Sequence, residues 1–431
     1  MNTEQLYKVY LRHPEVTTDS RHCPEGGMFF ALRGENFDGN KYALSALDQG
    51  CAVAVVDREE TIPAGDSRFI LVDDVLQTMQ ELAAMHRRRC DIPVVQVTGT
   101  NGKTTTKELL AAVLSRKFNV LYTQGNLNNH IGVPLTLLRL RPEHETAVVE
   151  TGANHPGEIA FLCGMVQADC GLITNVGRAH LEGFGSFAGV KRTKGELYDD
   201  LKKRGALAFL NTSDADLSAM AEERKLKTVP YVRGEVADCN PMLRVHWYCD
   251  ADGSRHTVQT NLIGAYNLAN VLAAITAGLH FGVQPKEIDN AIEAYRPTNS
   301  RSEFRKTAYN RLIVDAYNAN PTSMEAALDN FRLVQAENKM VILGEMRELG
   351  TDSAAEHQRI VDMLSTMPLN EIWLVGKEFA RCDSSAITVP LSLFDTVEQV
   401  SERLSASHPS GHTILIKGSN GTGLFRLPPM L

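Results

Sequence analysis

The chain has 431 residues, enough for about three domains that each bury their own core. Hydrophobic residues make up 43% and charged residues 22%, which excludes a disordered or fibrous protein. With 44 basic and 52 acidic side chains the formal net charge is −8, so the chain lacks the basic excess that suits a nucleic-acid backbone.

Hydropathy and cysteine spacing indicate the cellular compartment of the protein. No apolar run approaches the roughly eighteen residues that span a bilayer, and the first ten residues, MNTEQLYKVY, lack the apolar core of a signal peptide. The eight cysteines are scattered and form no CxxC pair. We therefore expect a cytoplasmic protein with reduced thiols, no membrane insertion and no zinc site. We also expect it to bind small molecules as a monomer.

Two breaks divide the chain into three predicted domains. A basic, helix-like stretch ends near residues 87–93, where a proline precedes a strand, and a second helical pattern stops at Pro297. The predicted domains are residues 1–90, 91–297 and 298–431.

Short apolar runs alternate with helical patterns in the second and third segments, for example a helix face over 107–114. This alternation predicts an α/β protein whose parallel sheets are covered on both sides. Polar residues follow each run, at the sheet edge where ligands bind in such folds. The predicted strands are 94–97, 147–149, 172–174, 312–314, 341–343 and 414–416.

The segment TGTNGKTTT at 98–106 has the spacing of a phosphate-binding loop in its shorter GxxGKT form. Glycines let backbone N–H groups surround phosphate oxygens, and the following helix N-terminus adds positive partial charge. Lys103 can reach the β- and γ-phosphates, and the Thr104 hydroxyl can bind Mg²⁺. The expected ligand is ATP.

Three further residues are less specific when read alone. Glu150 ends a predicted strand, where it can bind Mg²⁺ opposite Thr104 or be an exposed loop glutamate. His180 can be a functional or a structural histidine. By spacing alone Lys194 does not differ from Lys191 and Arg192, its neighbours on a predicted helix.

Taken together, motifs in all three segments resemble the Mur ligase family of ATP-dependent, amide-forming enzymes of peptidoglycan precursor synthesis. They are DSR at 19–21, FFALRGENFDG at 29–39, TGTNGKTTTKE at 98–108, GNLNNHIGVPLTLL at 125–138, ETGANHPGEI at 150–159, NVGRAHLEGFGS at 175–186, KGE at 194–196, GAYNLAN at 264–270, DAYNANPTSM at 315–324, GEMRELG at 344–350 and KGS at 417–419. Two positions depart from the pattern of many relatives: Asn40 replaces a histidine after FDG, and Tyr266 replaces a histidine before Asn267.

The resemblance implies a small N-terminal domain for the UDP moiety, a central ATPase domain and a C-terminal Rossmann-like domain. It also implies a set of site residues, with segment 297–301 as hinge. Residues implied to bind ATP are Gly99, Thr100, Asn101, Gly102, Lys103, Thr104, Thr105, Asn267, Asn270, Arg301 and Asp315. Residues implied to hold two Mg²⁺ ions are Thr104, Glu150, His180 and a carbamylated Lys194. Residues implied to act in catalysis are Lys103, His180, Lys194 and Arg301. Residues implied to contact the UDP-linked peptide or the dipeptide are Asp19, Ser20, Arg21, Asn126, Asn128, Asn318, Asn320 and Ser323.

The reaction implied by the resemblance joins D-Ala-D-Ala to UDP-N-acetylmuramoyl-tripeptide through an acyl phosphate. The main alternative is the family member that adds the third peptide residue. It commonly carries a DNPR-type motif, whereas here Asn320-Pro321 is followed by Thr322. Folylpolyglutamate synthetase and a non-catalytic nucleotide-binding protein are more distant alternatives. Retention of Lys103, Glu150, His180 and Lys194 disfavours the non-catalytic one.

Overall fold

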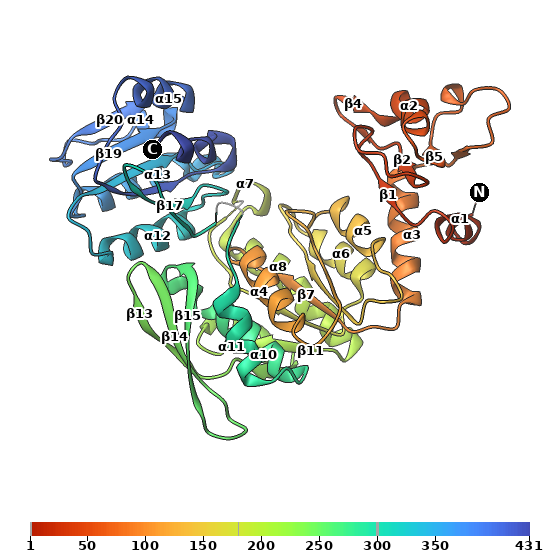
Figure 1. Cartoon of the computed structure of the whole chain (residues 1–431), viewed down its shortest axis with the longest axis horizontal. Helices are drawn as coiled ribbons and strands as arrows, with labels where there is room; N and C mark the ends of the chain where they lie inside the picture. The colour runs from red at the N-terminus through yellow and green to blue at the C-terminus, as the bar shows by residue number, and fades with distance from the viewer. Residues whose placement is uncertain (1, 180, 299–300) are drawn as a thin grey trace.

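The computed structural model describes residues 2–179, 181–298 and 301–431. Three α/β units follow one another, with the red N-terminal unit at one end and the blue C-terminal unit at the other (Figure 1). The α/β class with parallel sheets, predicted from the apolar runs, is confirmed. The division at 90/91 and 297/298 remains a prediction.

The N-terminal unit contains a four-stranded parallel sheet in the order β1-β2-β5-β6, with a small β3-β4 hairpin. Its elements are α1 (Thr3–Tyr10), β1 (Val16–Thr17), β2 (Met28–Phe30), β3 (Arg33–Gly34), β4 (Phe37–Asp38), α2 (Ala43–Asp48), β5 (Val53–Val56), β6 (Phe69–Leu71) and α3 (Val75–Arg89). Helix α3 runs from this unit to the central one (Figure 1).

Helices α1 and α3 fasten the N-terminal unit to the central unit. The Tyr10 hydroxyl donates to the carbonyl of Leu138 at 2.8 Å. The buried Arg87 guanidinium donates to the carbonyl of Val166 at 2.9 Å and pairs with Asp169 at 3.0 Å. Apolar side chains of the two units share one continuous core cluster, so this junction is part of the folded core.

The central unit is built on a six-stranded parallel sheet in the order β12-β11-β10-β7-β9-β8. Its elements are β7 (Val94–Thr98), α4 (Lys103–Leu114), β8 (Val120–Tyr122), α5 (Gly132–Leu137), β9 (Thr146–Glu150), α6 (Glu158–Val166), β10 (Cys170–Ile173), α7 (Leu181–Phe184), α8 (Phe187–Arg204), β11 (Leu207–Leu210), α9 (Ala215–Glu223), β12 (Lys227–Pro230), α10 (Leu268–His280) and α11 (Pro285–Ala294).

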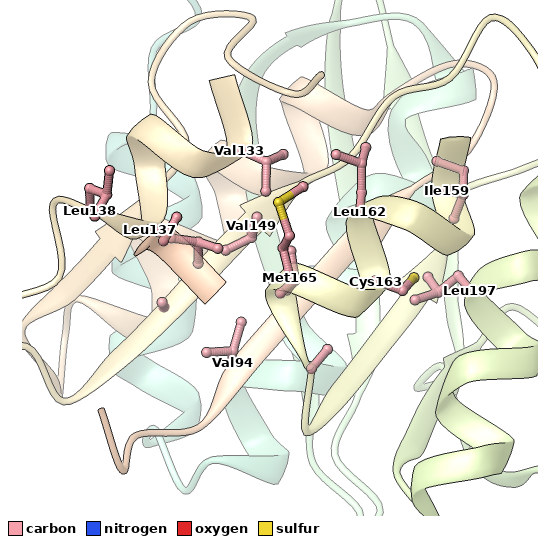
Figure 2. Close-up of a cluster of buried hydrophobic side chains, with 14 of the residues drawn as sticks. Val94, Val133, Leu137, Leu138, Val149, Ile159, Leu162, Cys163, Met165 and Leu197 are labelled. Carbon is pink, nitrogen blue, oxygen red and sulfur yellow. The ribbon is translucent and has the colours of Figure 1, made fainter. Parts of the chain in front are cut away.

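The middle strands β7, β9 and β10 are buried along their whole length because helices cover both faces of the sheet. Successive side chains point to opposite faces, so Val94 and Val149 enter one core cluster while Val95 and Val148 enter the other. Figure 2 shows the first of these faces, where Val94 and Val149 lie among side chains of α5, α6 and α8. The labelled helix residues there are Val133, Leu137, Ile159, Leu162, Cys163, Met165 and Leu197.

A three-stranded antiparallel sheet, β13 (Gly234–Cys239), β14 (Met242–Tyr248) and β15 (Arg255–Ile263), lies between β12 and α10 in the chain. It was not among the predicted strands. In β14, Leu243, Val245 and Trp247 are buried whereas Arg244 is exposed, the alternation of a sheet with one covered face.

The C-terminal unit holds a six-stranded sheet in the order β16-β17-β21-β18-β19-β20, parallel except for β16. Its elements are β16 (Glu303–Lys306), β17 (Arg311–Asp315), α12 (Pro321–Leu333), β18 (Lys339–Gly344), α13 (Ser353–Ser365), β19 (Glu371–Val375), α14 (Lys377–Ala380), β20 (Leu391–Phe394), α15 (Val397–Ala406) and β21 (Thr413–Lys417). The six predicted strands correspond to β7, β9, β10, β17, β18 and β21; β10 ends one residue early, at Ile173. Over the described parts of the chain, every helix is too short or too polar to cross a bilayer.

Candidate active site

A cavity of about 740 Å³ lies where the central and C-terminal units meet. It opens beyond the carboxyl ends of β7, β9 and β17, the edge at which open α/β sheets bind ligands. Predicted site residues that line it are Thr100, Asn101, Gly102, Lys103, Thr105, Asn126, Asn128, Glu150, Asn267, Asn270, Arg301, Asp315, Asn318 and Ser323.

The phosphate loop connects β7 to α4 at the point where the strand order switches, because β7 lies between β9 and β10. Gly102 has φ +79°, and a Cβ there would lie 2.6 Å from the Asn270 side-chain oxygen. This backbone shape therefore requires glycine. The Lys103 ammonium folds back over the loop and donates to the carbonyls of Gly99 and Thr100, both at 2.9 Å.

Glu150, at the end of β9, is buried opposite the first turn of α4. Its Oε1 accepts from the Thr104 hydroxyl at 3.2 Å and from the Asn128 amide at 2.8 Å. Its Oε2 is buried without a hydrogen-bond partner in the described part of the chain. A buried carboxylate oxygen without a partner beside a hydroxyl fits Mg²⁺, which prefers oxygen ligands.

Positive charge exceeds negative charge around the phosphate loop. Burial, together with the nearby charge of Arg301, lowers the pKa of Lys103 to about 8, although Glu150 acts in the opposite direction. The Arg301 guanidinium stacks on the Tyr317 ring at 3.8 Å, and its Nε has no partner among the described residues. A bound polyanion would compensate these partly buried cations.

Lys194, in α8, lies just behind the cavity wall. Its ammonium donates a long hydrogen bond, 3.4 Å, to the carbonyl of Ala153 and lies 5.3 Å from the centre of the Phe184 ring. Burial and the charge of Lys103 lower the pKa of Lys194 to about 7. Much of this side chain is therefore a neutral amine at neutral pH, in contrast to an ordinary helix lysine.

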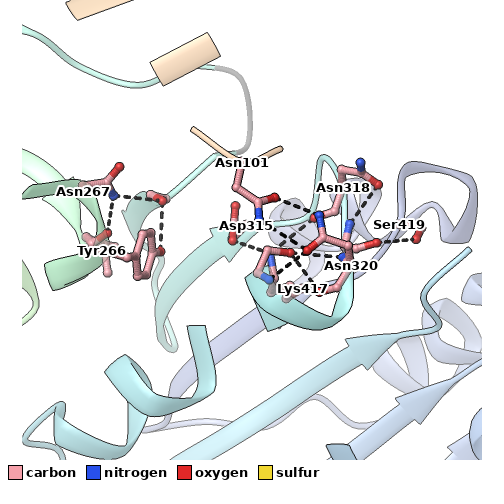
Figure 3. Close-up of polar contacts among 12 residues, drawn as sticks. Asn101, Tyr266, Asn267, Asp315, Asn318, Asn320, Lys417 and Ser419 are labelled. Carbon is pink, nitrogen blue, oxygen red and sulfur yellow. Dashed lines mark hydrogen bonds and ion pairs between the residues drawn. The ribbon is translucent and has the colours of Figure 1, made fainter. Parts of the chain in front are cut away.

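Asn267 and Asn270 form a buried amide chain on the wall of the cavity formed by α10. The Asn270 amide donates to the Asn267 oxygen at 2.8 Å, and the Asn267 amide donates to the carbonyl of Ile263 at 2.8 Å. Tyr266 shares a hydrogen bond of 3.1 Å with the Ser302 hydroxyl (Figure 3). Tyr266 therefore links the central unit to the segment entering the C-terminal unit.

On the C-terminal side, the Asp315 carboxylate pairs with the buried ammonium of Lys417 at 2.6 Å. The two residues are neighbours in register on β17 and β21 (Figure 3). In the sequence, Lys417 stands out only as part of the KGS motif and as a polar residue directly after the apolar run 414–416. Its role beside Asp315 was missed because the two positions are 102 residues apart.

Asn320 joins the phosphate loop to α12 (Figure 3). Its amide donates to the Asn101 side-chain oxygen at 2.8 Å, and its own oxygen accepts from the backbone N–H of Ser323 at 2.9 Å. Asn320 and Ser323 thus form the N-terminal cap of α12. Asn318 lines the cavity and accepts the N–H of Ala319 with its side-chain oxygen.

The remaining predicted site residues lie elsewhere. Asp19, Ser20 and Arg21 lie in the β1–β2 loop of the N-terminal unit and are not part of the cavity lining. Arg21 pairs with Asp19 through hydrogen bonds of 2.9 and 2.8 Å, which keeps the pKa of Asp19 below its usual range. His180, and residues 299–300 of the predicted hinge, lie outside the described residues. Among the residues described, there is no group of three or more His, Cys, Asp or Glu side chains that could hold a metal ion.

Family models and known proteins agree with this arrangement. The Mur ligase family catalytic-domain model matches residues 14–90, the middle-domain model matches 97–278, and the glutamate ligase domain model matches 300–420. UDP-N-acetylmuramoyl-tripeptide–D-alanyl-D-alanine ligase of Bacillus subtilis is 32% identical over 98% of this chain and 96% of that protein.

Two solved structures have the same fold over nearly the whole length. MurF from Acinetobacter baumannii has a TM-score of 0.84 and 31% identity, covering 99% of this chain and 97% of that chain. MurF ligase from Thermotoga maritima, in complex with ADP, has a TM-score of 0.82 and 26% identity, covering 97% of each chain. The resemblance found in the motifs is confirmed, and the chain belongs to the Mur ligase family.

Proposed function

We propose that the protein joins D-Ala-D-Ala to UDP-N-acetylmuramoyl-tripeptide and that the reaction converts ATP to ADP and phosphate. The single observation that carries this proposal is the cavity between two α/β units, with a phosphate loop on one wall and α12 on the other. The names of the relatives favour this ligase over the one that adds the third peptide residue.

The reaction needs an activated carboxylate because a carboxylate and an amine do not condense at neutral pH. The terminal carboxylate of the tripeptide attacks the γ-phosphorus of ATP, giving an acyl phosphate and ADP. The amine of D-Ala-D-Ala then attacks the acyl carbon, and inorganic phosphate leaves as the amide forms. The amine loses one proton in this step.

Two anions meet in the first step, so the main task of the protein is to neutralise charge and position the reactants. Lys103 and Arg301 provide positive charge near the transferring phosphoryl group. Gly99, Thr100, Asn101, Gly102 and Thr105 would surround the phosphates, while Asn267 and Asn270 would face the adenine and Asp315 the ribose. The ADP complex of the Thermotoga maritima relative supports a nucleotide in this fold.

Thr104 and Glu150 would hold one Mg²⁺ ion, which when bound neutralises phosphate charge. Lys194, together with His180, would help hold a second. A carbamate formed from the neutral Lys194 amine and carbon dioxide would replace the cation with an oxygen ligand. The lowered pKa of Lys194 supports this proposal, because only the neutral amine reacts with carbon dioxide.

The other substrates are assigned to residues of all three units. Asp19, Ser20 and Arg21 would contact the UDP moiety, and Asn126 and Asn128 the peptide. Asn318, Asn320 and Ser323 would lie near D-Ala-D-Ala. We further propose a cytoplasmic monomer that binds these small molecules; the eight unpaired cysteines support a reducing compartment.

The test is phosphate release from ATP with each substrate pair. Release that requires both the UDP-linked tripeptide and D-Ala-D-Ala, with the mass of the amide product, is the expected result. Release with a UDP-linked dipeptide and a diamino acid would instead assign the third-residue step. Binding of ATP without release in either case would indicate a non-catalytic protein.

A further inference from the structure

Lys107 is a buried cation of the phosphate-loop helix that the proposed reaction does not use. It lies in α4 and is 0% exposed. Its ammonium donates to the main-chain carbonyl of Thr123 at 2.8 Å, approaches the Glu108 carboxylate at 3.4 Å and lies 5.6 Å from the centre of the Tyr122 ring. Burying an ammonium is costly, so this contact requires an explanation.

The regular pairing of β8 with β9 changes at Thr123, whose carbonyl accepts from Lys107. The N–H of Thr123 donates to the carbonyl of Val148 at 3.1 Å, as in a continuing parallel ladder. The next bond of that ladder would run from the N–H of Glu150 to the carbonyl of Thr123. The Lys107 ammonium occupies this carbonyl, and the N–H of Glu150 donates instead to the Thr123 hydroxyl oxygen at 3.0 Å.

We propose that Lys107 and Thr123 are positioning residues that hold the Glu150 backbone where its carboxylate can bind Mg²⁺. The carboxylate is already held on one side, because Thr104 and Asn128 both donate to Oε1, while Oε2 has no partner among the described residues. Fixing the backbone N–H, together with the two donors to Oε1, restricts where the free oxygen can lie. This inference rests on the proposed ATP and Mg²⁺ site.

The variants distinguish the role of the Thr123 hydroxyl from that of side-chain packing. Thr123→Val keeps the shape but removes the acceptor for the Glu150 N–H, whereas Thr123→Ser keeps the acceptor. Lys107→Met removes the cation at similar length. Thr146→Val is the matched control. Like Thr123, Thr146 is fully buried, and it begins β9, the strand that ends at Glu150. Its hydroxyl donates to the carbonyl of Pro93 at 2.9 Å.

The readout is binding of the non-hydrolysable β,γ-imido analogue of ATP, measured by calorimetry over a series of Mg²⁺ concentrations and without Mg²⁺. We expect Thr123→Val and Lys107→Met to need about tenfold more Mg²⁺ for half-maximal enhancement of binding, and Thr123→Ser to stay within about twofold of the wild type. Affinity without Mg²⁺ is expected to be the same in all variants. Circular dichroism melting checks that each variant is folded.

Several outcomes would overturn the inference. Wild-type Mg²⁺ dependence in Thr123→Val would remove the role of the hydroxyl, and equal weakening in Thr146→Val would reduce the effect to packing of β9. If Thr123→Val does not fold, the Thr123→Ser variant provides the test. A Mg²⁺ requirement raised as much in Thr123→Ser as in Lys107→Met would contradict the proposal. Analogue binding by the wild type that is independent of Mg²⁺ would refute the metal site itself.

Discussion

Replacing Lys194 with methionine tests whether a buried site cation lowers folding stability. The side chain is 2% exposed, and among the described residues its ammonium makes one long hydrogen bond, to Ala153. Burial and then Lys103 lower its pKa to about 7, against the opposing charges of Glu196 and Glu158. Methionine keeps the length and the apolar stem, so mainly the charge is lost.

The size and sign of the effect follow from proton linkage. A lysine in the unfolded chain keeps a pKa of 10.5, so between about pH 7 and pH 10.5 the unfolded state binds more protons than the folded state. Stability therefore rises with pH across this window, and the full penalty applies below pH 7. Lowering the pKa to about 7 corresponds to roughly 4 to 5 kcal/mol. Relaxation around the charge reduces this penalty, so we expect Lys194→Met to gain about 2 to 4 kcal/mol at pH 6.5.

Urea unfolding followed by circular dichroism at pH 6.5, 8.0 and 9.5 measures this gain. Buffers are kept free of carbon dioxide, because a carbamate on Lys194 would remove the ammonium whose cost is being measured. Lys203→Met is the matched control, since Lys203 is an exposed lysine of the same helix. We expect it to change stability by less than about 0.5 kcal/mol.

The reasoning fails if Lys194→Met is no more stable than the wild type at pH 6.5. It also fails if the difference does not shrink toward pH 9.5, because the linkage requires that trend. Phosphate release should be lost in the same variant. Gained stability with lost turnover is the pattern expected when a destabilising group is kept for function.

Three further predictions concern the phosphate loop and the junction between units. Lys103→Ala should lower phosphate release by at least about a thousandfold while circular dichroism shows that the fold is kept; near-normal turnover would rule out the assigned role. Gly102→Ala should weaken binding of the ATP analogue at least about tenfold in calorimetry, because the added Cβ would meet Asn270. Gly164→Ala is the control and should bind the analogue normally, because a Cβ there meets open space. Tyr10→Phe should lower the free energy of unfolding in urea by about 1 kcal/mol, because it removes the hydroxyl donor that joins α1 to the central unit; an unchanged midpoint would contradict this.

Features that depend on neighbouring residues could be predicted from the sequence. Three of the four residues at 94–97 are valines because β7 is covered on both faces, and the loop that follows carries its glycines and Lys103 within a few residues. The antiparallel sheet was overlooked although residues 243, 245 and 247 alternate with more exposed ones. Alternation in so short a run identifies a strand only when the helices that cover its buried face are known. Here these helices are α10 and α11.

Local patterns of a few residues are enough to predict the α/β class and the phosphate loop, and ordered motifs in all three segments indicate the family. Which distant groups meet at the site depends on the tertiary structure. Asn101 pairs with Asn320 across 219 positions, and Asp315 pairs with Lys417 because β17 and β21 lie side by side. The diversion of the Glu150 N–H to Thr123 appears only when the strands are in register. Strand order and register bring these groups together, and residue spacing along the chain does not encode either in a readable form.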